Sequence, residues 1–184
     1  MIMRTTFISA ALIILAVSTV EAQKPKPLLE VGQKIASVGL VIGGNTDGVG
    51  IGGSVEYGQV KFGDVGVIGV GVLAAYQSES RRSFGEQVTV SALPIMFTTN
   101  AHFGLAGQPK IGLYGGASMG IVRYSVSHSS AFDTDLFGFG ASGTQLGVGV
   151  QGGLRFAVSP TAMVHGQLAL GDLPLFTAGM SFKF

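Results

Sequence analysis

Two properties together constrain this chain most: its composition is apolar, and after residue 22 it contains no segment long enough to form a membrane-spanning helix. Hydrophobic residues make up 47% of the 184 residues and charged residues only 11%, which indicates that something other than water covers much of the surface. After Ala22, Gly, Ser, Gln or a charged residue interrupts every apolar run before it is long enough to span a bilayer. The only other structure that satisfies its backbone hydrogen bonds inside lipid is a closed β-barrel.

An alternation of apolar and polar residues with a period of two predicts β-strands. It is clearest at 175–184, where large apolar residues such as Phe182 alternate with polar ones such as Lys183. Eight segments of this kind lie at about 36–43, 49–57, 65–76, 88–103, 110–126, 145–156, 162–170 and 175–184. The adjacent apolar residues Ile121 and Val122 suggest a β-bulge in the fifth segment.

The connections between these segments alternate in character. Turn-forming stretches lie at 59–63, 104–109 and 159–161, and the stretches on the other side lie at 44–48, 77–87, 127–143 and 171–174, of which the middle two are long and polar. Short turns on one side and long loops on the other are typical of outer-membrane barrels, whose short turns face the periplasm. The sequence therefore predicts an all-β protein, an eight-stranded antiparallel up-and-down transmembrane β-barrel after an N-terminal signal peptide.

Residues 1–22 are expected to be that signal peptide. Arg4 precedes an apolar stretch at 7–17, and small residues at positions 20 and 22 mark a cleavage site after Ala22. A retained signal anchor is the alternative. Residues 23–33 then form a polar, proline-containing periplasmic lead, and residues 34–184 form the barrel.

Several classes of function are disfavoured by composition. A net charge of +1 argues against nucleic acid as a partner. The absence of cysteine means no disulfide, no thiol metal site and no lipidated cysteine. Three G-x-G-x-x-G matches, at 48–53, 138–143 and 147–152, are not followed by a predicted helix, so neither a dinucleotide nor another cofactor is expected.

Four stretches resemble a known family: 93–103, 109–116, 152–156 and 179–184. They are similar to the small eight-stranded outer-membrane β-barrel proteins with an opacity-like domain, found in many diderm bacteria and often in Bacteroidota. The resemblance implies an outer-membrane location and makes Phe182 and Phe184 the expected signal for the barrel-assembly machinery. The lack of Trp and the presence of only four Tyr predict a weak aromatic girdle.

One set of polar residues is expected to converge inside the barrel, toward the short turns. Its members are Glu56, Asn100, His102, Arg155 and Lys183. We interpret the set as a buried ion-pair and hydrogen-bond network, because a charge kept from water must be paired. A proton or ion path is the alternative, which the narrow interior of an eight-stranded barrel disfavours.

The loop 127–143 holds a second constellation. His128, Ser130 and Asp133 are weak candidates for a catalytic triad of a lipid A-modifying enzyme of the deacylase kind. A solvated loop without chemistry is the favoured interpretation. Asp133 and Asp135 alone supply too few oxygen ligands for Ca²⁺, so no metal site is expected.

Two further sites have simple interpretations. Arg81 and Arg82, flanked by Glu79 and Glu86, are expected to keep a loop in water, with contact to lipopolysaccharide phosphates as the alternative. His165 is expected to form a hydrogen bond in the lumen rather than to bind a metal.

The sequence as a whole predicts a monomeric outer-membrane barrel with a packed lumen. Its expected role is structural or interactive, through loops that serve adhesion, envelope integrity or contact with lipopolysaccharide or a host ligand. Two alternatives remain: a lipid A-modifying enzyme, and a lipocalin-like periplasmic carrier whose apolar faces would point inward.

Overall fold

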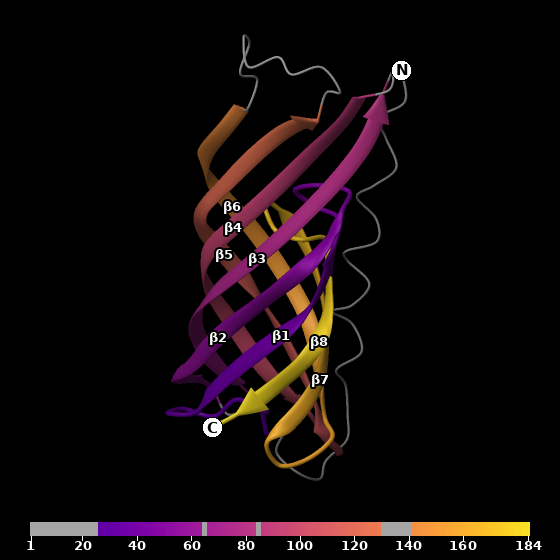
Figure 1. Cartoon of the computed structure of the whole chain (residues 1–184). Helices are drawn as coiled ribbons and strands as arrows, with labels where there is room; N and C mark the ends of the chain where they lie inside the picture. Colours follow the sequence, from indigo (N-terminus) through magenta and orange to yellow (C-terminus); the bar gives the residue numbers. More distant parts are fainter. Residues whose placement is uncertain (1–25, 64–65, 84–85, 130–140) are drawn as a thin grey trace, which may run out of the picture.

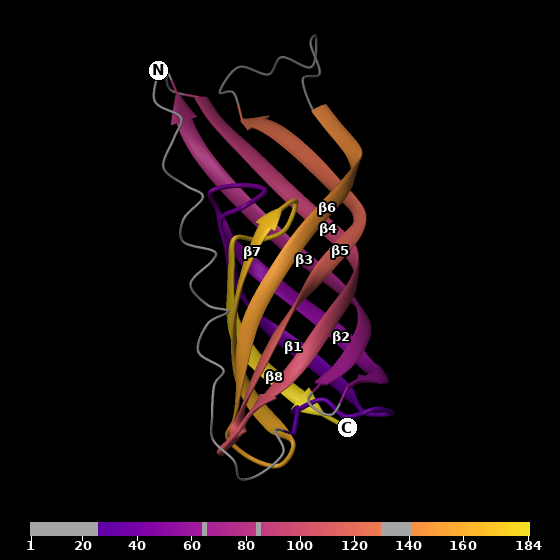
Figure 2. The same ribbon diagram turned by 180° about the vertical axis from the view of Figure 1, so that it is seen from behind.

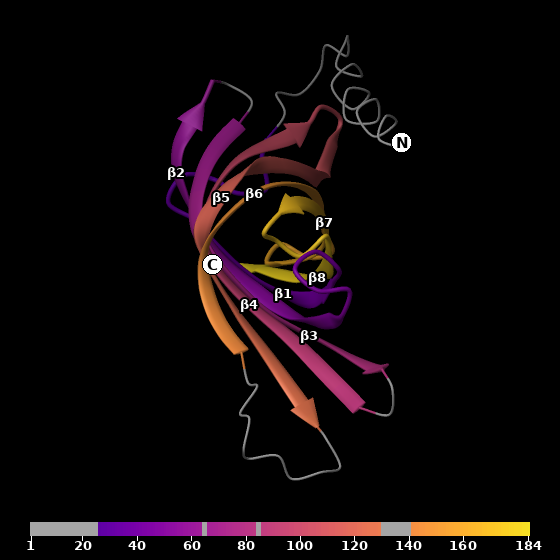
Figure 3. The same cartoon turned by 90° about the horizontal axis from the view of Figure 1, so that it is seen from above.

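The computed structural model describes residues 26–63, 66–83, 86–129 and 141–184. Its strands are β1 (Lys34–Ile42), β2 (Val49–Phe62), β3 (Gly66–Ser83), β4 (Glu86–Leu105), β5 (Gln108–Ser129), β6 (Ala141–Ala157), β7 (Ala162–Gly171) and β8 (Phe176–Lys183). Each strand pairs antiparallel with the next, and β8 pairs with β1, so the sheet closes into a barrel (Figure 1), seen from above in Figure 3. The predicted fold class and strand number are confirmed. In the described part of the chain, no helix is long and apolar enough to cross a membrane.

The two ends of the barrel differ. The turn end carries the start of β1, the end of β8 and three short connections, and the loop end carries the other connections. Strands β3, β4, β5 and β6 have 18, 20, 22 and 17 residues, whereas β1, β7 and β8 have 9, 10 and 8. The four long strands rise above the others as one wall at the loop end (Figure 1), visible from behind in Figure 2. Because a tilted strand crosses a bilayer with about 9–11 residues, this long-strand wall continues well beyond it.

The predicted long loops are shorter than expected. A loop is expected at 77–87, but β3 continues to Ser83 and β4 begins at Glu86, and the two remain paired there. Residues 127–129 and 141–143 likewise belong to β5 and β6. The apolar–polar alternation stops in these extensions because both faces of the wall can meet water, whereas backbone pairing continues.

The predicted bulge is also misplaced. Ile121 is 47% exposed and Val122 fully buried, so their side chains alternate normally, and the register of β5 with β4 and β6 passes through both without a shift. Register shifts occur instead at the turn end, between Gly104 and Leu105 of β4 and between Gly58 and Val60 of β2. The shift in β2 accompanies a strand that is longer than predicted, so the first turn follows Phe62 rather than lying at 59–63.

The outward face of the barrel is apolar and the inward face largely polar. Phe97 and Leu146, both on the outside, are 70% and 71% exposed, whereas Glu56 and Arg155, on the inside, are 2% and 4% exposed. An apolar exterior of this extent on a protein with a polar core matches a protein surrounded by lipid.

The turn end also carries an aromatic girdle, which is stronger than expected. It consists of the outward-phase residues Tyr57, Phe62, Phe103, Phe156, Phe182 and Phe184. The Phe62 and Phe103 rings meet edge to face with centroids 6.3 Å apart. Phenylalanine thus takes the place of the missing Trp and Tyr.

Inward glycines allow the sheet to close. Gly52, Gly39 and Gly179 face one another across β2, β1 and β8. A Cβ on Gly179 would lie 2.0 Å from the carbonyl oxygen of Val38, and one on Gly39 would lie 2.4 Å from that of Ala178. The bare backbone at these positions lets the two ends of the sheet approach each other.

The same use of glycine explains the G-x-G-x-x-G matches. Residues 49–53 lie in β2 and residues 147–152 lie in β6 of the antiparallel sheet. The match at 138–143 lies partly outside the described residues. Neither of the first two opens a helix, so they are strand glycines rather than phosphate-binding turns.

A substitution at the β1–β8 seam tests this account. Gly179→Ala should hinder closure, because its Cβ meets backbone that cannot move without breaking the pairing. Gly166→Ala on the neighbouring β7 is the matched control, since its Cβ meets nothing within 4 Å. We expect Gly179→Ala to lose most of the folded, fast-migrating species on unheated gels and Gly166→Ala to keep it. Equal behaviour of the two variants would contradict the role of the seam.

Candidate functional site

The polar residues inside the barrel come from alternate strands. Glu56 lies on β2, Asn100 and His102 on β4, and Arg155 on β6, each in the inward phase. The strands between them contribute inward glycines: a Cβ on Gly71 would lie 3.0 Å from Glu56 Cγ, and one on Gly116 would lie 2.5 Å from Asn100 Oδ1. Glycine on every second strand therefore makes room for long side chains from the others.

The Glu56 carboxylate is the centre of the network. It accepts hydrogen bonds from Arg155 Nη2 and Asn100 Nδ2, and His102 Nε2 lies 3.3 Å from Oε1. Arg155 Nη1 also lies 3.3 Å from His102 Nδ1. Because a guanidinium only donates, Nδ1 accepts and Nε2 carries the proton, so this geometry fits the neutral Nε2–H form of the imidazole.

Tyr114 of β5 covers the other side of Arg155 and was not singled out from the sequence. Its ring centroid lies 4.4 Å from the guanidinium carbon and 5.7 Å from the His102 ring, at an interplanar angle of 24°. Its hydroxyl donates to Gln167 Oε1 at 3.0 Å. Gln151 extends the network by donating to Asn100 Oδ1 at 2.9 Å. The inward phase of these residues is the sequence signal that could have identified them.

Lys183 does not join this set. Four of the five predicted network residues meet, but the ion pairs recorded among the described residues do not include Lys183, which is half-buried at the turn end. Its neighbour two positions earlier, Ser181, is fully buried, contacts His165 Nδ1 at 2.9 Å and lies 2.8 Å from the Ser37 hydroxyl. The expected lumen hydrogen bond of His165 is thus present. Among the described residues, no group of three or more His, Cys, Asp or Glu side chains could hold a metal.

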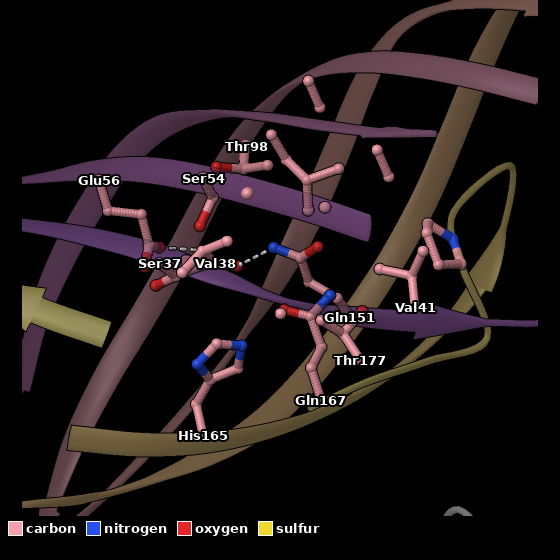
Figure 4. Close-up of a pocket in the computed structure, with 18 of the residues that line it drawn as sticks. Ser37, Val38, Val41, Ser54, Glu56, Thr98, Gln151, His165, Gln167 and Thr177 are labelled. Atoms are coloured by element: carbon pink, nitrogen blue, oxygen red, sulfur yellow. Dashed lines mark hydrogen bonds between the residues drawn. The ribbon is translucent and has the colours of Figure 1, made fainter. Parts of the chain in front are cut away.

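Apolar clusters lie above and below the network. The loop-end cluster consists of Leu73, Met96, Val122, Ala169 and Leu173. The turn-end cluster consists of Leu29, Ile35 and Met163. The polar side chains between them surround a cavity of about 30 Å³, room for about two water molecules. Figure 4 shows Glu56 of β2, Gln151 of β6, and His165 and Gln167 of β7 pointing into this interior.

Two segments outside the strands complete these clusters. Leu173, in the connection between β7 and β8, is fully buried, and so is Leu29 of the N-terminal lead. The lead is held by hydrogen bonds from Gly32 N to Gly58 O and from Gly58 N to Gln33 O, each of 2.9 Å. The part of the predicted polar lead that the structure describes therefore crosses the turn-end mouth and closes it with leucine.

Comparison with known proteins identifies the family that has this architecture. The chain matches the model of the outer membrane protein beta-barrel domain over residues 7–178. The chain belongs to this family. No curated protein matches the sequence.

Solved structures show the same fold at low sequence identity. Ail, the attachment invasion locus protein of Yersinia pestis, in complex with the heparin analogue sucrose octasulfate, is 14% identical; the match covers 84% of this chain and 99% of Ail with a TM-score of 0.55. Ail alone is 16% identical with the same coverage and a TM-score of 0.51. The N-terminal β-barrel domain of Pseudomonas aeruginosa OprF is 17% identical over 84% of this chain and 98% of that domain, with a TM-score of 0.44.

Membership of the outer-membrane β-barrel family indicates which surfaces of the barrel face lipid, the periplasm and the outside of the cell. The protein is located in the cell outer membrane, the apolar exterior faces lipid, and by the rule for such barrels the turn end faces the periplasm and the loop end the outside. A lipocalin-like periplasmic carrier is therefore wrong, since it would need the apolar face inside.

Of the candidate catalytic residues, only His128 belongs to the described part of the chain. His128 lies near the end of β5, in register with Val88 of β4. Ser130, Asp133 and Asp135 lie outside the described residues.

Arg81 occupies a defined position at the loop end. It is exposed, donates to Asp47 Oδ2 at 2.6 Å and forms an ion pair with Glu79. These three residues, together with Val88 and Val90, line a recess of about 340 Å³ between the β1–β2 connection and the long-strand wall. Arg82 is exposed beside it.

The central ion pair leads to a stability prediction. Glu56→Gln leaves the Arg155 charge buried without a counter-charge, which should lower the free energy of unfolding by about 3–5 kcal/mol in a urea titration in detergent. Glu56→Leu with Arg155→Met removes both charges and should stay closer to the unmodified protein. A double variant as unstable as Glu56→Gln would contradict this account.

Proposed function

We propose that this outer-membrane barrel has a structural and surface-interaction role rather than a transport or catalytic one. It supports the envelope as a rigid, closed barrel and holds the long-strand wall and its loops outside the cell. The observation that carries the proposal is the interior. Apolar clusters lie on both sides of the Glu56–Arg155 ion network, and the cavity of about 30 Å³ among the polar side chains is too small for a substrate path.

The long-strand wall supports the interactive part of the proposal. Side chains link β3 and β4 of the wall: the Tyr76 hydroxyl donates to Ser91 at 3.2 Å, and beyond the last pairing with β2 the Ser80 and Thr89 hydroxyls lie 2.9 Å apart. Such cross-strand pairs hold an extended sheet in one shape. The wall carries the recess beside Arg81 and the residues 130–140. The complex of Ail with a heparin analogue is an example of a barrel of this fold with a bound ligand.

The proposal also covers the export, assembly and oligomeric state of the protein. A signal peptide is cleaved after Ala22, the barrel-assembly machinery recognises Phe182 and Phe184, and the barrel acts as a monomer. The placement of Phe184 agrees with the assembly part of the proposal: its backbone exchanges hydrogen bonds of 2.9 and 3.0 Å with Lys34 across the β1–β8 seam.

Removal of Phe184 tests the assembly signal. The truncated protein should reach the outer membrane at a reduced level, because it loses both the aromatic end and the last paired residue of the seam. Quantification in purified outer membranes checks this. Phe184→Tyr is the control, since it keeps an aromatic ring and the backbone pairing, and normal levels of the truncated form would contradict the proposal.

Deletion of residues 130–140 tests the surface role while leaving the described strands intact. In a non-adherent diderm host, cells that display the full chain should bind to heparin-coated or matrix-coated surfaces more than cells that display the deletion variant. Lipid A analysed by mass spectrometry should be identical in both.

The same measurements distinguish the alternative enzyme. A changed lipid A acyl pattern that is abolished by His128→Ala or Ser130→Ala would replace the interactive role with a deacylase-like one. Unchanged adhesion after deletion, with surface levels equal, would contradict the assignment of binding to this segment.

A further inference from the structure

Lys34 occupies an unusual position on the lipid-facing surface. Its strand places Val38, Leu40 and Ile42 outward, and Lys34 has the same phase and is exposed. It pairs with Tyr57 of β2 on one side and with Phe184, the residue after β8, on the other. Residues directly opposite each other in antiparallel strands project to the same face.

Lys34 is thus a single cation within the aromatic girdle. Tyr57 and Phe184 are 39% and 67% exposed, so the aromatic rings on both sides of Lys34 are open to the surroundings. The next outward residue above Lys34 is Ala36, which is small. A lysine at the edge of a bilayer extends its amine toward the headgroup region while its methylenes stay against apolar neighbours.

The charges of the turn end favour anions as a whole. Its described charged side chains other than Glu56 and Arg155 are Lys26, Glu30, Lys34, Lys61, Lys110 and Lys183. Lys26 is paired with Glu30 at 3.0 Å, and none of the other four lysines forms an ion pair with another described residue. At the loop end, by contrast, Arg81 is paired with Asp47 and Glu79. Among the described side chains, the excess of positive charge therefore lies at the turn end.

We propose that Lys34, between Tyr57 and Phe184, is a binding site for the headgroup of an anionic phospholipid in the periplasmic leaflet of the outer membrane. The amine pairs with the lipid phosphate, and the two rings contact the glycerol region and the first part of the acyl chains. Lys61, Lys110 and Lys183 raise the local concentration of anionic lipid around the same end. This inference rests on the outer-membrane location and orientation, and not on the surface role of the loops.

The chemistry of the site favours lipid over a polymer of the periplasm. Lys34 is in the outward phase of a strand whose next outward side chains are all apolar, so its amine lies beside acyl chains and headgroups. A cell-wall polymer would meet the connections below the barrel instead. An amine within the girdle is less screened by salt than one fully in water, which strengthens its attraction for phosphate.

The absence of tryptophan allows a direct test. Tyr57→Trp introduces one reporter beside Lys34. The full chain carrying it is folded into phosphatidylcholine vesicles that contain either brominated phosphatidylglycerol or brominated phosphatidylcholine at the same fraction. Because bromine quenches only indole groups in contact with the lipid, the ratio of the two quenching curves gives the relative affinity at this site. We expect a preference of about fivefold for phosphatidylglycerol, decreasing as salt is raised.

Further substitutions in the Tyr57→Trp protein test whether Lys34 causes the lipid preference. Lys34→Gln should reduce the ratio to about one and Lys34→Arg should keep it, whereas Arg82→Gln, an exposed cation at the other end, should change nothing. Folding of each variant is verified by its gel mobility without heating.

Two results would overturn the proposal. One is equal quenching by the two brominated lipids in the protein that retains Lys34. The other is a preference for phosphatidylglycerol that persists after Lys34→Gln. If purified peptidoglycan retains the protein in a Lys34-dependent manner while the two lipids quench equally, the turn end is a cell-wall contact and the lipid assignment is wrong. Loss of cell adhesion after deletion of residues 130–140 bears only on the loop function, so the two proposals fail independently.

Discussion

The requirement that every backbone hydrogen bond be satisfied inside lipid is the constraint on which this structure depends. It forces β8 to pair with β1, and that seam is possible because Gly39 and Gly179 meet without side chains. Closure with only eight strands in turn makes the interior narrow. The narrow interior must be filled by the protein itself, so the choice of inward side chains follows from the choice of strand number.

Polar and charged side chains in such an interior are stable only if they are paired with one another and kept from water. Glu56 receives three donors, and Arg155 is enclosed by Glu56, His102 and the Tyr114 ring. Inward glycines on the intervening strands provide the space, and apolar clusters at both ends exclude solvent. In an environment of this kind an ion pair is strong and a lone charge is costly. The same arrangement that makes the barrel stable also makes it a poor channel, which is why we place its function on its surfaces.

Those surfaces divide the molecule along its axis. At the loop end, the long-strand wall extends beyond the membrane and pairs its charges locally, as Arg81 does with Asp47 and Glu79. At the turn end, phenylalanines form the girdle, the lead closes the mouth with Leu29, and Lys34 lies outward among the aromatic side chains. We propose that the first end contacts what lies outside the cell and that the second contacts the phospholipid leaflet.

The sequence by itself determined the strands, their number and the face on which each side chain lies, because the backbone fixes a period of two for every strand. It therefore also determined that Glu56, Asn100, His102 and Arg155 point inward. Only the tertiary structure decided which inward residues touch: Tyr114 joined this network and Lys183 did not. It also decided that Leu29 and Leu173 close the lumen and that Lys34 lies between Tyr57 and Phe184. These contacts depend on strand tilt, register and closure between segments far apart in the chain, and no local pattern of residues carries that information.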